Sequence, residues 1–182
     1  MSLMLLGILN QQASGGGGAY DLLETVSLTS VASSVTFSAI NQTYKHLQIR
    51  VVSRTTFGVT SVTDTVRLNA DSGSNYSQHF LYGNGSSVNS LAATSQNYLR
   101  GVLSAGSGAT ANSFGRSVID ILDYNNTSKY KTSRSLMGAD DSITLASTAW
   151  MSLSAVTSIS ITAAASANYV AGSRFSLYGI KG

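Results

Sequence analysis

Few side chains in this chain could carry out acid–base or metal chemistry. There are two histidines, His46 and His79, and eight carboxylates spread over 182 residues. His46 alternates with Gln48 and Arg50, which is the pattern of a histidine on the exposed face of a strand. Because the chain has no cysteine and no third histidine, a zinc site would have to recruit carboxylates from separate segments. We therefore expect no enzyme activity, no metal and no cofactor.

Two acidic segments come closest to a chemical motif. Asp71-Ser-Gly-Ser-Asn75 has oxygen ligands like the start of a calcium loop, but it lacks the further acidic positions and the closing glutamate. A turn in which the Asp71 side chain bonds nearby backbone is the better interpretation. Asp120 and Asp123 could face each other across a groove in a polysaccharide hydrolase, although a pair of carboxylates at a strand end is simpler.

The composition favours a protein that is buried in an assembly. Charged residues make up 10% of the chain, whereas a soluble domain has about 25%, and hydroxyl, amide and glycine residues take their place. The net charge is +3, and the basic residues form no group closer than Lys129, Lys131 and Arg134. A nucleic-acid binder gathers its basic residues on one stripe, so we expect no nucleic acid as a partner. A free β-domain with hydroxyl-rich solvent faces would have a similar composition.

The first 18 residues differ from the rest of the chain. Met1 to Asn10 is apolar, and Gln11 to Gly18 contains four consecutive glycines, which form a joint with little conformational preference. The apolar run is far shorter than the ~20 residues of a membrane span, so we expect no membrane partner. It also lacks the basic start and the cleavage site of a secretory signal, so we expect it to be retained.

The apolar side chains of this arm would form a patch in water, so we expect them to bind a partner protein. The predicted partner-binding residues are Leu3, Met4, Leu5, Leu6, Ile8 and Leu9. The alternative is that the arm folds back onto its own domain.

The remaining residues, 19–182, show the period-two pattern of strands and no amphipathic helix. The segment from Lys45 to Ser53 places Leu47, Ile49 and Val51 on one face. The segment from Phe114 to Tyr124 is apolar on both faces, which predicts a central strand covered on both sides. The other predicted strands are Leu22 to Leu28, Ser34 to Ile40, Val62 to Asn69, Tyr76 to Tyr82, Tyr98 to Leu103, Ala149 to Leu153, Ser158 to Thr162 and Arg174 to Ile180.

Turn residues separate these strands, and Asn84-Gly85 is the strongest short signal for a hairpin. Eight or more short strands, with turns about every ten residues, are typical of two packed sheets. We therefore predict an all-β fold, an antiparallel two-sheet β-sandwich of the jelly-roll variety. It forms one domain, residues 19–182, behind an extended apolar N-terminal arm and joint, residues 1–18.

Several segments resemble virion structural proteins of tailed bacteriophages. They are the apolar start with its glycine joint, the segments Tyr44 to Arg50 and Leu68 to Tyr76, and the ending Gly172 to Lys181. The resemblance covers most of the chain, but it involves structural segments and no catalytic motif. It implies a β-sandwich that assembles as a homo-oligomer, often a trimer, on the head or the tail.

Within that family, the length favours a head decoration, or cement, protein, because the long repetitive shaft of a receptor-binding fibre is missing. Such a protein binds the major capsid protein, or another virion protein, on the capsid surface and is made in the bacterial host cytoplasm. The alternative is a carbohydrate-binding head or tail appendage, whose exposed tyrosines would bind a host glycan.

Overall fold

The computed structural model describes residues 18–182, which form twelve strands and one short 3₁₀ helix. The strands are β1 (Tyr20–Ser27), β2 (Ser34–Phe37), β3 (His46–Ser53), β4 (Ser61–Leu68), β5 (Tyr76–Gly83), β6 (Val88–Gln96), β7 (Leu99–Ala105), β8 (Gly115–Leu122), β9 (Lys131–Gly138), β10 (Ile143–Trp150), β11 (Ile159–Thr162) and β12 (Arg174–Ile180), and the 3₁₀ helix η1 spans Ala164–Ser166. The arm residues Leu3, Met4, Leu5, Leu6, Ile8 and Leu9 lie outside the described residues, so their binding role stays a prediction.

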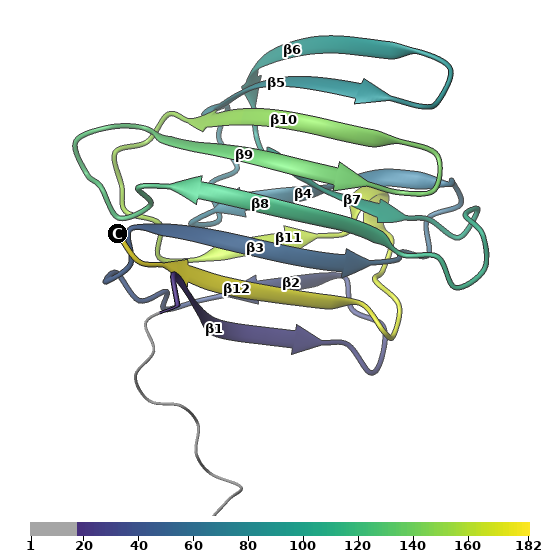
Figure 1. The fold of residues 1–182 in the computed structure, drawn as a ribbon, viewed down its shortest axis with the longest axis horizontal. Coiled ribbons are helices and arrows are strands. Elements are labelled where there is room, and N and C mark those ends of the chain that lie inside the picture. The colour runs from purple at the N-terminus through teal and green to yellow at the C-terminus, as the bar shows by residue number, and fades with distance from the viewer. Residues whose placement is uncertain (1–17) are drawn as a thin grey trace, which may run out of the picture.

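The strands form two antiparallel sheets that pack against each other, which confirms the predicted all-β sandwich (Figure 1). The larger sheet has the order β1-β12-β3-β8-β9-β10-β5-β6, and the smaller has the order β2-β11-β4-β7. In Figure 1 the smaller sheet lies behind the lower part of the larger one, and β5 and β6 extend beyond it. The jelly-roll variety is not confirmed by this strand order.

The core lies between the two sheets, and β3 supplies its centre as the alternation predicts. Leu47 and Ile49 are completely buried, and Val51 is 2% exposed, while Arg50 on the opposite face is exposed. Large side chains from both sheets, and Tyr169 from the segment before β12, complete the core; those from the sheets include Phe37, Val66, Leu68, Ile119, Ile121, Ile159, Ile161 and Phe175. Removing this apolar surface from water is the main force that holds the sheets together.

The prediction that β8 is covered on both sides is wrong. Ile119 and Ile121 point into the core, but Val118 on the opposite face is 38% exposed. The larger sheet is covered by the smaller sheet on one face only, so the apolar residues on its other face remain accessible. Strands β6 and β9 were not expected, and β10 begins six residues before the predicted Ala149.

Both predicted turns are confirmed. Asp71 Oδ1 accepts the Gly73 N–H at 2.8 Å, which makes an Asx-type turn between β4 and β5. Asn84-Gly85 forms the β5–β6 hairpin, where Gly85 has a positive φ of 84°. No helix in the described part of the chain is long and apolar enough to cross a bilayer.

Candidate docking face

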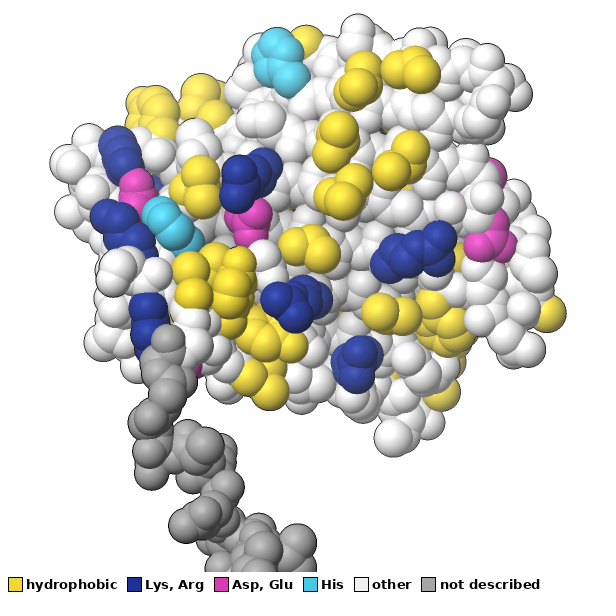
Figure 2. Space-filling view, viewed as in Figure 1, with side chains coloured by type: hydrophobic (Ala, Val, Ile, Leu, Met, Phe, Trp, Pro, Cys, Tyr) yellow, Lys and Arg dark blue, Asp and Glu magenta, His cyan; other side chains and the backbone are white. Residues whose placement is uncertain are grey.

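One face of the larger sheet points away from the smaller sheet, and we call it the outer face. Four apolar side chains lie side by side across it, each the direct cross-strand partner of the next: Leu81 on β5, Leu145 on β10, Leu136 on β9 and Val118 on β8. Their exposed fractions are 45%, 52%, 50% and 38%. This apolar ladder crosses four strands, and Figure 2 shows hydrophobic side chains in the upper half of this face, with further groups in its lower half.

The ladder forms the floor of a groove of about 1010 Å³. Polar side chains border the apolar floor, and they include His79, Asp120, Arg134 and Ser147. An apolar floor with a polar border is typical of surfaces that bind another molecule.

The alternation of β9 places Leu136 on the outer face. Its inward residues are Lys131, Ser133, Ser135 and Met137, which are 1%, 4%, 5% and 1% exposed. Ser135 Oγ bonds the backbone oxygen of Arg100 on the smaller sheet. Met137 points into the interior, where it belongs to a buried cluster with Leu103 and Ala146, so its neighbour Leu136 points outward.

A chain of hydrogen bonds runs beside the ladder across β3, β8 and β9. Arg50 Nε donates to Gln48 Oε1 at 2.8 Å, and Gln48 Nε2 donates to Asp120 Oδ1 at 2.8 Å. The second carboxylate oxygen of Asp120 accepts Arg134 Nε at 2.9 Å. These bonds hold the long side chains in place, so the surface beside the ladder is preorganised for binding.

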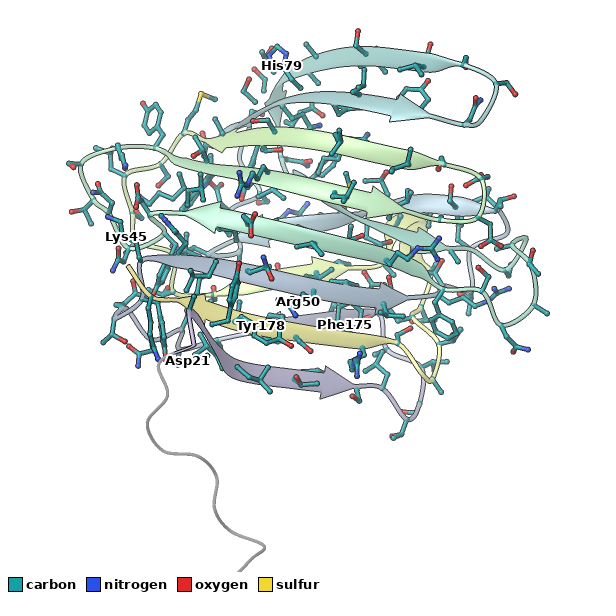
Figure 3. All side chains as sticks on the ribbon, in the orientation of Figure 1. Asp21, Lys45, Arg50, His79, Phe175 and Tyr178 are labelled. Carbon is teal, nitrogen blue, oxygen red and sulfur yellow. The ribbon has the colours of Figure 1, made fainter. Side chains whose placement is uncertain are left out.

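Two tyrosines support Arg50 from the strands on its other side. The Arg50 guanidinium carbon lies 4.5 Å from the ring centroid of Tyr178 and 5.6 Å from that of Tyr20. Figure 3 labels Arg50 and Tyr178 on the adjacent strands β3 and β12. Cation–π contacts of this kind fix the guanidinium and occupy the ring faces.

The outer face is basic. Arg50, Arg116, Arg134 and Arg174 all project from it, and within residues 18–182 only Arg134 among them forms an ion pair with a carboxylate. Arg116 and Arg174 are both cross-strand partners of Val52, which is 38% exposed. Unpaired arginines beside apolar side chains favour a partner that offers carboxylates around an apolar centre.

No family model matches this chain, and no curated protein matches it. The geometry of the described residues is therefore the basis for a functional assignment.

The candidate catalytic residues have structural partners in this fold. His46 Nδ1 accepts the backbone N–H of Asp123 at 2.9 Å, and the His46 side chain is 28% exposed. Asp120 is bound by Arg134, whereas Asp123 is bound by Lys129 and Lys45. The hydrogen bond from Lys129, followed by that from Lys45, lowers the pKa of Asp123 below its usual range.

His79 is exposed and borders the groove on the outer face. Within residues 18–182, no group of three or more histidines, aspartates and glutamates is placed to hold a metal ion. The expectation of a chain without metal, cofactor or enzyme activity stays a prediction.

Asp64 is a buried carboxylate that the strand pattern did not reveal. It lies in β4 beside a register shift and is fully buried between the sheets. Burial raises its pKa to about 6, although hydrogen bonds from Ser104 Oγ and the Ala164 N–H act in the opposite direction. Because the surrounding side chains shield it completely from solvent, we assign Asp64 a structural role.

Proposed function

We propose that this chain is a structural protein of a tailed-phage virion, a capsid decoration protein that docks on the major capsid shell and stabilises it. The apolar ladder on the preorganised, basic outer face is the observation that supports this proposal. In a monomer these side chains would be left in water, and in a particle they can be covered by a neighbouring protein.

The ladder can contribute substantially to docking. Burying the exposed half of one leucine side chain contributes about 1 kcal/mol, so the four residues together contribute about 4 kcal/mol before ordering costs. The ladder is rigid because each residue lies on a central strand, and little entropy is lost when a partner covers it.

The N-terminal arm supplies a second contact in this proposal. Its six large apolar side chains would bind a neighbouring virion protein while the glycine joint allows the distance between the two contacts to vary. Two linked contacts bind more tightly than either alone, because the second binding step is intramolecular. The low content of charged residues agrees with a chain that is covered in its assembly.

A carbohydrate-binding appendage is the second candidate. The observation that favours it is Tyr20 and Tyr178, two tyrosines near one end of the outer face. Their rings already contact Arg50, however, so their faces are less available to stack on a sugar. For this reason we favour docking on a protein.

Attachment to purified virions tests the proposal. We expect the chain to be found by mass spectrometry in virions of the phage whose genome encodes it, and to survive washing. Leu136→Asp combined with Leu145→Asp would place charge on the ladder, and deletion of residues 1–10 would remove the arm. Each change should lower occupancy on the particles while leaving the circular dichroism spectrum unchanged.

Leu153→Asp is a matched control, because Leu153 is 51% exposed and lies in the loop after β10. This variant should bind like the wild type. Absence of the chain from virions would contradict the function, and full occupancy of the ladder variant would exclude the outer face. Binding to a glycan array by the wild-type chain, together with loss of that binding in Tyr178→Ala, would favour the appendage instead.

A further inference from the structure

Strand β6 leaves one backbone edge of the larger sheet open. It is the terminal strand, and its only neighbour in the sheet is β5. Its nine residues, Val-Asn-Ser-Leu-Ala-Ala-Thr-Ser-Gln, contain no charged side chain and no proline. An uncharged edge strand of this length is a template for pairing with another strand.

Neither face of β6 is covered in the described part of the chain. Leu91 is 52% exposed on the inner face of the larger sheet, the face that the smaller sheet covers elsewhere. Val88 is 71% exposed on the outer face. Figure 1 shows why, because the smaller sheet ends before it reaches β6. The hairpin therefore exposes apolar residues in two directions as well as a backbone edge.

The opposite edge of the same sheet is protected. β1 contains Asp21 and Glu24, and its register with β12 shifts between Leu22 and Glu24. Asp21 also forms an ion pair with Lys181 at 2.9 Å. Charges and bulges are the usual devices that prevent edge pairing. β6 also has a register shift, between Ala93 and Gln96, but from Val88 to Ala93 its register with β5 is regular and it carries no charge.

We propose that β6 pairs with β6 of a second copy of this chain, antiparallel and about a two-fold axis at Leu91. A second copy fits because the edge is neutral, so two identical edges do not repel. The contact uses the same surface on both copies and therefore closes as a dimer, while each protected β1 edge stays unpaired. This register places the two Leu91 side chains opposite each other on one face, where each covers the other.

The pairing goes beyond the proposed function and is independent of it. It would join two larger sheets into one continuous sheet and bring two outer faces side by side. It also predicts a dimer, where the resemblance to phage proteins implies a trimer.

Light scattering of the full chain in solution tests the pairing. The expected mass is twice the 18.9 kDa of one chain. Leu91→Lys should reduce it to 18.9 kDa while circular dichroism shows a folded protein. Leu22→Lys is the matched control, since Leu22 is 59% exposed on the β1 edge, and it should leave the mass of the dimer unchanged. A monomeric or trimeric wild type, or a dimer that Leu91→Lys leaves intact, would overturn the pairing.

The absence of cysteine from the sequence allows a second readout. Under mild oxidation Leu91→Cys should form a disulfide-linked dimer, because cross-strand partners have their Cβ atoms close enough for the bond. Leu22→Cys should remain uncross-linked. Equal cross-linking of both variants, or none in Leu91→Cys, would contradict pairing at β6. Attachment to virions is measured separately, so either proposal can fail without the other.

Discussion

Asp64 accepts a hydrogen bond from the Ser104 hydroxyl between the two sheets, and Ser104 in turn shares a hydrogen bond of 2.6 Å with Ser53. All three side chains are completely buried. The bonds join β4 and β7 of the smaller sheet to β3 of the larger one. A carboxylate in this position makes the stability of the sandwich depend on pH.

We expect the contribution of Asp64 to the free energy of unfolding to decrease as the pH rises from about 4 to about 6, while the lowered pKa values of Asp21, Asp71, Asp123 and Asp140 act in the opposite direction. The pKa of Asp64 is about 6 in the folded protein, whereas the ordinary value for an aspartate in an unfolded chain is 3.8, so the folded chain binds the proton more tightly. The stability from Asp64 is therefore fully present below about pH 4 and is lost as the pH rises through about 6. A shift of this size corresponds to about 3 kcal/mol.

Urea unfolding at several pH values measures this dependence. Asp64→Asn should remove the loss of stability that Asp64 causes between about pH 4 and about pH 6, and it should be more stable than the wild type at about pH 8. Asp141→Asn, which changes an exposed carboxylate, should retain the wild-type slope. An unchanged slope in Asp64→Asn would show that another group is responsible.

Gly115→Ala should strongly destabilise the fold. A Cβ atom at this position in β8 would lie 2.1 Å from the Leu103 carbonyl oxygen of β7, so the two sheets would have to separate locally. Overpacking of this kind costs about 1–3 kcal/mol, and we expect a loss near the upper end. In Gly58→Ala, nothing lies within 4 Å of the new Cβ, so its melting temperature should stay close to that of the wild type.

Trp150→Phe should destabilise the turn between β4 and β5. Trp150 Nε1 donates to Asp71 Oδ2 at 2.7 Å, and phenylalanine keeps an aromatic ring without this donor. A lost hydrogen bond to a charged group costs about 1.5–3 kcal/mol. Trp150 is the single tryptophan of the chain, so the substitution also removes the tryptophan fluorescence signal. Unfolding should therefore be followed by circular dichroism. Equal stability of Trp150→Phe and the wild type would mean that water replaces the bond.

The sandwich could be predicted from the sequence because its core strands alternate clearly. Leu47 and Ile49 lie between polar or charged residues and Val51 follows Arg50, so their shared face was evident. β9 and β6 were missed for a physical reason. The buried side of β9 carries Ser133 and Ser135, and β6 is exposed on both faces, so neither strand has a distinct apolar face.

The candidate site could not be predicted from local pattern. Leu81, Leu136 and Leu145 become neighbours only because β10 pairs with both β9 and β5, and the β10–β5 pairing joins segments about sixty residues apart. In β9, Leu136 and the buried Met137 are adjacent and both apolar, so the sequence does not indicate which of them faces solvent. The partner-binding residues predicted in the arm lie outside the described residues, and their role remains a prediction.

Strand β12 lies between β1 and β3, although it follows every other described strand in the chain. During synthesis, β1 is therefore made long before β12, its only partner in the sheet. β1 can join the larger sheet only after β12 has been made, whereas the other six strands have partners that precede β12 in the chain. Any stop codon or protease cut before Arg174 would release a chain whose β1 has no neighbour to join, and chaperones or proteases would be expected to act on it.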